Sequence, residues 1–309
     1  MARATVSEVL RRSAALLPAA PGVYRFVDAQ RRVAYLGRAG DLRARVRSYT
    51  GDLADRPHLR RMVPQVAAVE ALACASAHEA AWLERNLLER SLPRWNRVRG
   101  GLELPAWLVL DDGSARPDLR VVVGERPCGE AYGPYLGVER LAAARGGVLR
   151  AWPLPLSGDR LDVAGRSLAE ARGVAPSDRA GYVAAIRAVL ARESAAVGAL
   201  GARLEEAGAA AVERLAFETA AQVRDERAAV GWLVAPQRVT GCARGLVVGG
   251  WADGTGFVLR ATSDRLDRWS AGPVEEAAAR EAAGRTPEEW RDFAVLNAGL
   301  AARLAAVAR

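Results

Sequence analysis

The sequence predicts an α+β fold in which short strands and helices are mixed along the chain. Three observations support this prediction. Short runs rich in β-branched and aromatic residues lie near the start, residues 177–234 are Ala-rich and helical in pattern, and Asp253-Gly254 separates two strand-like runs near the end. With 309 residues and 50% hydrophobic content, the chain can bury one or two ordinary cores.

The first hundred residues alternate between runs typical of short strands and runs typical of amphipathic helices. Tyr24 and Tyr35 fall on the two strands of a predicted hairpin, so their phenols stand on neighbouring strands. Asp41 can cap the next helix, on which Arg45 lies one turn from Tyr49. In chain order, the predicted elements are strands at 23–27 and 32–36, a helix at 42–49, a core helix at 58–69 bent near Pro64, a strand at 69–74 and a helix at 80–90.

The helix predicted at residues 80–90 has one unusual position. Ser76-Ala-His-Glu79 in front of it matches a capping box. Its apolar residues form one arc, and Glu84 is the only charged residue inside that arc; outside it lie Glu79, Arg85, Glu89 and Arg90. A carboxylate on a buried helix face is costly unless a cation or several donors satisfy it. A metal ion or an arginine must therefore lie near Glu84, and a salt bridge, for instance to Arg45, accounts for the pattern as well as a metal does.

After a boundary at residues 99–105, the remaining two thirds of the chain predict a small β region, a helical region and a final hairpin with helices. In chain order, we expect strands at 106–110 and 119–123 around the turn Asp111-Asp-Gly-Ser, a loop and short helix from Gly133-Pro-Tyr135, helices across 177–234 broken by Gly198, Gly201 and Gly208, strands at 245–251 and 256–262, and a closing helix from Thr286-Pro287.

The net charge of +8 suggests a polyanionic partner, and its distribution is uneven. Residues 1–100 hold 18 Arg against 9 acidic residues, whereas residues 101–309 hold 26 Arg against 27 acidic residues. The basic excess therefore belongs to the first hundred residues. Because the chain has no lysine and is rich in alanine, a pattern typical of a GC-rich genome, its arginine content alone is not evidence for phosphate binding.

Cysteine spacing and hydropathy exclude several classes of protein. Cys74, Cys128 and Cys242 are isolated, without the CxxC spacing of a zinc site or the density of a disulfide framework. No apolar run approaches the ~20 residues that span a bilayer, and an acidic residue lies near the N-terminus before any apolar core. We therefore expect a cytoplasmic protein with no membrane association.

Several runs together resemble one known family. They are Leu17-Pro-Ala-Ala-Pro-Gly-Val-Tyr24, Ala34-Tyr-Leu-Gly-Arg-Ala-Gly-Asp-Leu-Arg-Ala-Arg45, Ser48-Tyr49, Leu83-Glu-Arg-Asn-Leu-Leu88 and Pro93-Arg-Trp-Asn96. In order and at near-fixed spacing over about eighty residues, they resemble the GIY-YIG endonuclease domain at the N-terminus of the excinuclease component UvrC. The resemblance implies that residues 1–100 form a small α/β nuclease domain with a short antiparallel sheet flanked by helices.

The resemblance assigns roles to the residues that match its motifs. Glu84 matches the family's metal-ligating glutamate and would hold a single Mg²⁺ or Mn²⁺. Tyr35 would be the general base and Tyr24 would position the base or the attacking water. The remaining site residues are Arg45, which would neutralise charge on the phosphate, Arg38, which would contact the same or a flanking phosphate, Tyr49, which would orient the scissile group, and Asn96, which would fix local structure beside the metal.

The chain departs from the family in two respects. Arg38 occupies a position that is usually lysine, and because the chain has no lysine anywhere we interpret this as a tolerated exchange. Only about 75 residues follow the helical region, too few for the second nuclease and the tandem helix-hairpin-helix modules of UvrC. The chain is thus similar to shortened relatives of the Cho type, or to the segment after an exonuclease domain in some actinobacterial fusion proteins.

The resemblance also implies partners and a division into segments. Residues 204–225 resemble the UVR motif, the helical hairpin that docks on the helicase UvrB, which acts with UvrA; a simple packing arm or dimer element is the alternative. DNA would be held mainly through phosphate contacts. The expected segments are a nuclease domain at 1–100, a β-containing connecting region at 101–176, the UVR-like hairpin at 177–236 and a C-terminal β-hairpin with helices at 237–309.

Two functions follow from these features. The first is metal-dependent hydrolysis of a phosphodiester in damaged DNA, on the 3′ side of a lesion, in nucleotide excision repair. The second is a non-catalytic or weakly catalytic DNA-binding adaptor that docks on UvrB through the UVR-like hairpin. An enzyme that acts on a branched recombination intermediate is a third option.

Overall fold

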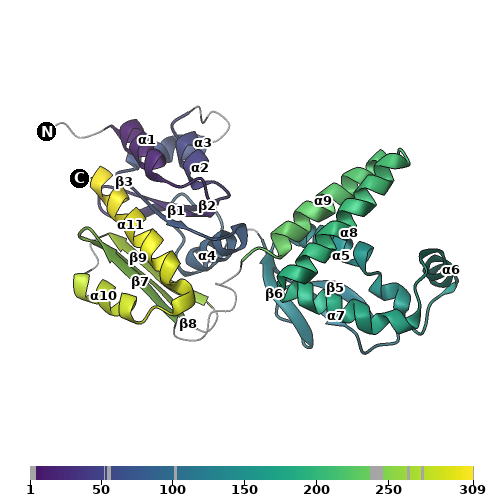
Figure 1. The fold of residues 1–309 in the computed structure, drawn as a ribbon. Coiled ribbons are helices and arrows are strands. Elements are labelled where there is room, and N and C mark those ends of the chain that lie inside the picture. The colour runs from purple at the N-terminus through teal and green to yellow at the C-terminus, as the bar shows by residue number, and fades with distance from the viewer. Residues whose placement is uncertain are drawn as a thin grey trace. The chain divides into compact units, whose positions relative to one another are not determined.

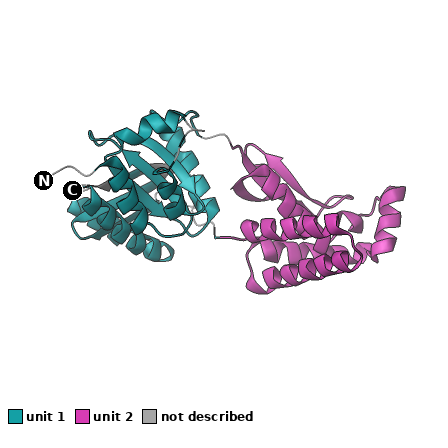
Figure 2. Cartoon of the chain, turned by 90° about the horizontal axis from the view of Figure 1, so that it is seen from above, with its two compact units in different colours: residues 1–102, 236–309 teal, residues 103–235 magenta. Residues whose placement is uncertain are grey.

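The computed structural model describes residues 5–51, 53, 57–100, 103–236, 246–262, 265–272 and 275–308. Cys242 and residue 245, the predicted start of a strand, lie outside the described residues. The chain divides into two compact units, residues 1–102 with 236–309 and residues 103–235 (Figure 2). The described strands form three antiparallel three-stranded sheets among helices, which confirms the predicted α+β class (Figure 1).

Unit 1 is built on a three-stranded sheet in the order β2-β1-β3. Its strands are β1 (Gly22–Val27), β2 (Val33–Ala39) and β3 (Ala68–Ala73). Because side chains alternate along a strand, Tyr24 and Phe26 face one side of the sheet and Val23 the other. The first side is covered by α1 (Val6–Leu16), α2 (Leu42–Ser48) and α3 (Pro57–Met62), and the second by α4 (Ala77–Arg90).

Most elements predicted for this part of the chain are confirmed. The hairpin is present, Asp41 caps α2 by accepting from the Ala44 N–H at 2.9 Å, and Ser76 caps α4. The helix predicted at 58–69 is wrong beyond residue 65: α3 ends at Met62, a 3-10 turn (Val63–Gln65) follows, and the chain then turns into β3, where it pairs with β1. The sequence analysis did not predict α1.

Each outer edge of this sheet is closed by the side-chain amide of an asparagine. On β2, Asn96 accepts from the Leu36 N–H at 2.9 Å and donates to the Leu36 carbonyl at 2.8 Å. On β3, Asn297 accepts from the Ala73 N–H at 2.7 Å and donates to the Ala73 carbonyl at 3.1 Å. Asn96 is partly exposed, whereas Asn297 is fully buried. The two amides replace neighbouring strands that a sheet edge would otherwise recruit.

Residues 246–308 complete unit 1 from the far end of the chain. They form a sheet of β7 (Leu246–Ala252), β8 (Thr255–Thr262) and β9 (Arg265–Gly272), together with α10 (Glu276–Gly284) and α11 (Arg291–Val307). The predicted turn is confirmed, since Asp253 and Gly254 both have positive φ, as a two-residue hairpin turn requires. The predicted closing helix is confirmed as α11, whereas β9 and α10 were not predicted. Phe257, Trp269 and Phe293 share a core with Val23 and Leu83 of the first sheet and α4.

Unit 2 packs helices against a sheet in the order β5-β4-β6. Its elements are β4 (Pro105–Asp111), β5 (Asp118–Val123), β6 (Glu130–Leu136), α5 (Val138–Ala151), α6 (Val163–Arg172), α7 (Arg179–Leu190), α8 (Ser194–Glu213) and α9 (Phe217–Leu233).

Two predictions for unit 2 are wrong. Gly133-Pro-Tyr135 belongs to strand β6 rather than to a loop, because an edge strand tolerates a proline that donates no ladder hydrogen bond; the helix predicted to follow is present as α5, from Val138. The three glycines from Gly198 to Gly208 lie inside one unbroken helix, α8. The chain instead turns at Arg192 and Leu215, both of which have positive φ.

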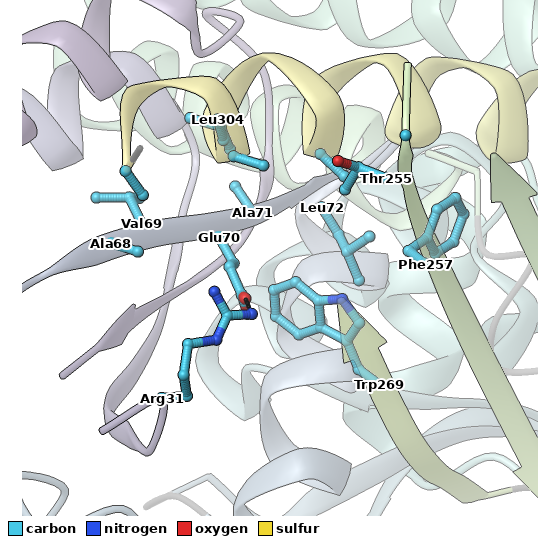
Figure 3. Close-up of a pocket in the computed structure, with 14 residues that line it drawn as sticks. Arg31, Ala68, Val69, Glu70, Ala71, Leu72, Thr255, Phe257, Trp269 and Leu304 are labelled. Carbon is cyan, nitrogen blue, oxygen red and sulfur yellow. Dashed lines mark ion pairs between the residues drawn. The ribbon is translucent and has the colours of Figure 1, made fainter. Parts of the chain in front are cut away.

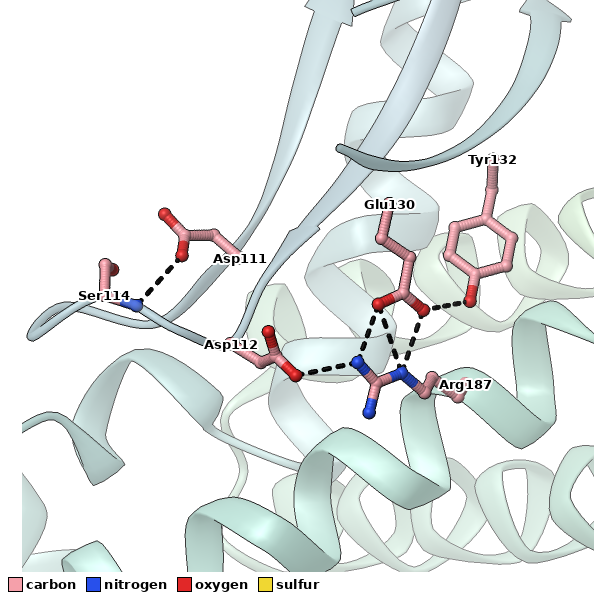
Figure 4. Close-up of polar contacts among 6 residues, drawn as sticks. All are labelled: Asp111, Asp112, Ser114, Glu130, Tyr132 and Arg187. Carbon is pink, nitrogen blue, oxygen red and sulfur yellow. Dashed lines mark hydrogen bonds and ion pairs between the residues drawn. The ribbon is translucent and has the colours of Figure 1, made fainter. Parts of the chain in front are cut away.

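Arginine side chains tie the helices of unit 2 to its sheet and to one another. In Figure 4 the Arg187 guanidinium of α7 bridges Asp112 and Glu130, with Nη2 2.7 Å from a carboxylate oxygen of each. The bond from Arg187 holds the pKa of Glu130 below its ordinary value. Between α5 and α9, Arg150 makes a bidentate pair with Glu226, whose side chain is almost fully buried. Charged pairs thus fix the register of packed elements in this unit.

Asn297→Ala should destabilise unit 1 by about 2 kcal/mol or more, because it leaves a buried N–H and a buried carbonyl of Ala73 unpaired. Asn96→Ala should cost less, since water can reach the partly exposed edge of β2. Differential scanning calorimetry of the two variants measures the difference. Equal losses of stability would show that the buried amide does not close the β3 edge in the way described.

Candidate active site

Two glycines are required by close packing around the site, Gly37 against two of its tyrosines and Gly22 against Leu72 and Leu42 beneath it. A Cβ at Gly37 would lie 2.7 Å from the Tyr24 hydroxyl and 2.9 Å from the ring of Tyr35. A Cβ at Gly22 would lie 2.3 Å from the Leu72 carbonyl and 2.5 Å from the side chain of Leu42. Gly37 faces Tyr24 across the β1–β2 ladder, so only glycine lets the phenol lie flat over the neighbouring strand. The spacing of tyrosine and glycine in the two motifs is therefore a packing requirement.

Three of the predicted residues form one hydrogen-bonded group. The hydroxyls of Tyr24 and Tyr49 lie 2.6 Å apart and share a hydrogen bond, and the Nε of Arg45 donates to the Tyr24 hydroxyl at 3.2 Å. The Arg45 guanidinium also lies 5.7 Å from the centre of the Tyr49 ring. Both tyrosines are buried, and α2 places Arg45 and Tyr49 one turn apart, as the sequence predicted.

Tyr35 joins this group through its ring. Its centroid lies 6.2 Å from that of Tyr24 and 6.4 Å from that of Tyr49. Burial, followed by the facing Tyr49, raises the pKa of Tyr35 well above its ordinary value. Burial, followed by Tyr49 and Tyr35, does the same to the pKa of Tyr24. Both phenols are therefore neutral at physiological pH in this state.

Glu84 contacts Arg38 on the other side of the sheet edge. One carboxylate oxygen accepts from the Arg38 backbone N–H at 3.1 Å, and the other lies 3.3 Å from the Arg38 Nε. The Glu84 side chain is 22% exposed, so it is half-buried rather than enclosed, and its arginine neighbour is Arg38 rather than Arg45. The prediction that Glu79 lies outside the buried face is wrong, because its carboxylate turns in to accept from the Ala75 N–H.

Two observations connect Glu84 and Arg38 with the tyrosine group. Tyr35 and Arg38 both lie on β2, and the negative charge of Glu84 is one of the causes that raise the pKa of Tyr35. Asn96 holds the backbone of Leu36, between Tyr35 and Gly37, through two hydrogen bonds. The structure therefore gathers all seven predicted residues around one end of β2. Asn96 takes part by holding the backbone of β2 in place.

The Glu84 carboxylate is suited to a hard cation that takes one protein ligand and keeps water in its other positions. In the part of the chain that the structure describes, no group of three or more His, Cys, Asp or Glu side chains could enclose a metal ion. Mg²⁺ commonly binds through one or two carboxylates, with water and substrate phosphate in its other positions. A partly exposed carboxylate beside an arginine fits that mode of binding.

Sequence reasoning found the chemical groups of the site but missed the supports that hold them. Arg43, for example, donates from Nε to the Leu17 carbonyl at 2.8 Å and so ties α2 to the end of α1. The amphipathic pattern of residues 6–16 could have predicted α1. Nothing local in the sequence pairs Asn297 with Ala73.

Comparison with known proteins places one domain in a family. Residues 20–97 match the family model of the UvrC-like GIY-YIG domain. UvrABC system protein C of Parasynechococcus marenigrum is 31% identical over 247 residues, which cover 76% of this chain and 38% of that protein. The corresponding protein of Natronomonas pharaonis is 38% identical over 136 residues, which cover 44% of this chain and 23% of that protein. The chain thus spans well under half the length of these relatives.

A solved structure also matches a part of the chain. The GIY-YIG N-terminal endonuclease domain of UvrC from Thermotoga maritima, described as bound to its catalytic divalent cation magnesium, is 30% identical. The alignment covers 29% of this chain and 98% of that domain, with a TM-score of 0.27.

In the part of the chain that the structure describes, no helix is long and apolar enough to cross a bilayer.

The raised pKa values of Tyr24 and Tyr35 predict a loss of stability in alkali. Each phenol has a higher pKa in the folded chain than the reference value of about 10, so the unfolded chain releases these protons first. Their contribution is complete below about pH 10 and declines as the pH rises further. Urea unfolding from about pH 8 to 11, with near-UV absorbance to count phenolates, measures this effect. Full ionisation of both tyrosines near pH 10 in the folded protein would contradict it.

Proposed function

Since residues 20–97 are a UvrC-like GIY-YIG domain, we propose that the chain is a metal-dependent endonuclease that hydrolyses a phosphodiester bond in DNA. The single observation that best supports this proposal is the gathering of two cations, a carboxylate and a phenol at one end of β2. Each of these groups suits one demand of the reaction: to bind an anion, to hold a metal and to accept a proton.

Arg45 and Arg38 would bind the phosphate. The Arg45 guanidinium is half-buried, and although burial lowers its pKa, the facing phenols, Tyr24 first, raise it by more. Arg45 therefore stays charged and is held in place by the Tyr24 hydroxyl. A fixed, partly desolvated guanidinium stabilises negative charge on a phosphate more strongly than a mobile one. Arg38 is less buried and would take a flanking oxygen.

Tyr35 would accept the proton of the attacking water, with Tyr24 and Tyr49 fixing the ring. In the resting state its pKa is too high for this role, and Glu84 contributes to that rise. A cation bound at Glu84, Mg²⁺ or Mn²⁺, would neutralise the carboxylate and supply Lewis-acid activation of the phosphate and water. Glu84 would thus hold the metal, and once its charge is cancelled the pKa of Tyr35 would fall, so that more of Tyr35 would be in the phenolate form, which can accept the proton.

The contact between Arg38 and Glu84 links substrate binding to the metal site. Arg38 lies against the carboxylate in the resting state. A phosphate that draws the Arg38 guanidinium to itself would leave a carboxylate oxygen open to a cation. A lysine, which is usual in the resembling family, would offer a point charge at the same position, so the exchange preserves the cation and changes the geometry of its donors.

We propose that the chain acts in nucleotide excision repair, because its relatives are named as components of the UvrABC system. We propose that it cuts on the 3′ side of a lesion, because residues 1–100 resemble the N-terminal domain of UvrC. DNA would bind through phosphate contacts, which makes affinity depend on salt and leaves damage recognition to partners.

The helical hairpin α8–α9 supports a docking role on UvrB. At its tip, three large apolar side chains are exposed: Val212 by 51%, Leu215 by 72% and Phe217 by 64%. The middle of α9 is held to α5 by the Arg150–Glu226 pair, in which Glu226 is buried, so the tip is presented on a rigid support. An exposed aromatic and aliphatic cluster on a rigid element is typical of a protein interface.

A second candidate function is that of a non-catalytic DNA-binding adaptor that docks on UvrB. It is favoured by one observation, the arginine at position 38 whose guanidinium already contacts the carboxylate of Glu84. Wild-type repair activity in a Tyr35→Phe variant that still binds UvrB would establish it. Preferential nicking of branched rather than lesion-bearing DNA would favour the third option.

Glu84→Gln should abolish nicking of lesion-bearing duplex in the presence of Mn²⁺, UvrA and UvrB, because the amide does not hold a divalent cation. Tyr35→Phe should lower the rate by about 10²-fold or more, because it removes the proton acceptor. Both should keep the wild-type melting temperature, since Gln can still accept from the Arg38 N–H.

The matched control for these variants is Glu89→Gln, which lies on the same helix and pairs with Arg85 at 3.0 Å. It should nick like the wild type. If Glu84→Gln nicks as fast as Glu89→Gln, the chain is not the proposed metal-dependent nuclease.

Phe217→Ala should weaken binding to UvrB by roughly tenfold or more, because exposed aromatic side chains contribute strongly when an interface covers them. It should leave the melting temperature unchanged, since the side chain is 64% exposed. Titration calorimetry with purified UvrB measures the affinity. The matched control is Val295→Ala, a comparably exposed apolar residue on α11. Identical affinities of the two variants would exclude the hairpin tip as the docking surface.

A further inference from the structure

A cavity of about 240 Å³ lies in unit 1 on the β3 side of the sheet, where β3 faces α11 and the C-terminal sheet (Figure 3). Val69, Ala71 and Leu72 of β3 line one wall, and Phe257 and Trp269 line another. The cavity exists because α11 presents small side chains to the strand; these are Ala301, Ala305 and Ala308. Its volume is below the usual range for drug-sized ligands, so it fits one small molecule.

The outer edge of β3 gives this cavity a row of backbone donors and acceptors. Asn297 binds the N–H and carbonyl of Ala73 from that side, so the same groups of Ala71, two residues away, point in the same direction. Ala71 lines the cavity, and in the described part of the chain neither a strand nor a side chain pairs with these two groups. The cavity therefore offers one N–H donor and one carbonyl acceptor side by side.

A third polar group faces the same cavity. The Trp269 side chain is 5% exposed, and its indole N–H has no hydrogen-bond acceptor. In Figure 3 the ring nitrogen lies on the edge of the ring turned toward Leu72 and Thr255. The ring itself is fixed by Arg25, whose guanidinium lies 4.1 Å from the ring centre and donates to the Trp269 carbonyl at 2.9 Å. A buried donor without an acceptor is costly, which points to a ligand that supplies one.

The pattern of these groups restricts the ligand. The N–H and carbonyl of one residue are matched by a partner that has its own carbonyl and N–H on the same side, as the side-chain amide of Asn297 does at Ala73. One residue of an extended peptide also matches them, as in an antiparallel ladder, but a cavity of about 240 Å³ lined by α11 has no room for a strand. A cyclic amide has its carbonyl and N–H on one side and is small enough to fit. A ring with a second carbonyl next to the amide N–H would also satisfy the Trp269 indole.

From this arrangement we propose that the cavity binds a pyrimidine base of the uracil and thymine type. Its imide edge pairs with Ala71 and Trp269, and its ring packs between Leu72 and Phe257. At the mouth, the half-exposed Arg31 lies 3.9 Å from Glu70 and is placed to meet a phosphate attached to the base. The base comes either from a free nucleotide or from a DNA strand. This site lies on the β3 edge, whereas the candidate active site lies on β2, and it does not depend on the proposed nuclease activity.

The test measures binding of thymidine, thymidine monophosphate and a single-stranded oligothymidylate to the full chain by titration calorimetry and saturation-transfer NMR. N3-methylthymidine, which lacks the imide N–H, should bind about tenfold more weakly than thymidine, the effect of one lost hydrogen bond. Ala305→Leu fills the cavity and should abolish binding, whereas Ala306→Leu, an exposed neighbour on the same helix, should bind normally.

Each outcome decides the proposal. Binding of thymidine that Ala305→Leu removes supports a free nucleotide ligand, and binding of the oligothymidylate alone, again removed by Ala305→Leu, supports a base within a strand. Trp269→Phe keeps a ring over Arg25 and should weaken either ligand severalfold. The absence of binding for all three probes, or binding that Ala305→Leu does not change, overturns the proposal and leaves a cavity filled by water. Glu84→Gln should bind thymidine like the wild type even if it, or the wild type, cuts no DNA.

Discussion

The structure of unit 1 depends on a constraint set by its small sheet: with three strands, two of the three have an open edge. Open edges are liable to pair with other chains, and their unpaired backbone groups are costly where water is excluded. This chain closes both edges with a side-chain amide, Asn96 on β2 and Asn297 on β3. The first comes from the loop after α4 and the second from a helix over two hundred residues later. The sheet is therefore incomplete without the end of the chain.

The two edges serve different purposes because their surroundings differ. The β2 edge is partly exposed and holds Tyr35 and Arg38, the groups that a phosphodiester must reach. The β3 edge is covered by α11, and the same amide-to-backbone contact that closes it at Ala73 is left unmade at Ala71. Because α11 covers the β3 edge and the backbone groups of Ala71 are unpaired there, this edge borders a cavity with polar groups in its wall. An exposed edge with charged side chains is a site for a large anionic substrate.

Local patterns predicted the local parts of this arrangement. Asp41, Ser76 and the Asp253-Gly254 turn were identified because capping and turn chemistry act over a few residues. Glu84 was identified because a charge on an apolar helix face needs a partner. The partner itself was not predictable: Arg38 lies on a strand 46 residues away, and only the folded sheet brings it to the carboxylate. Asn297 has no local signal at all, since its role is set by a contact across 224 residues.

The charges of the candidate active site are paired off in the resting state, and this explains why its residues must work together. Glu84 is balanced by Arg38, and Arg45 is balanced by hydroxyl dipoles rather than by a carboxylate. A phosphate adds negative charge to this group, and a divalent cation adds more positive charge than the phosphate removes. The phosphate therefore offsets only part of the charge that the cation brings into a half-buried site. Tyr35 responds to that change, because the charge of Glu84 is one of the causes that raise its pKa.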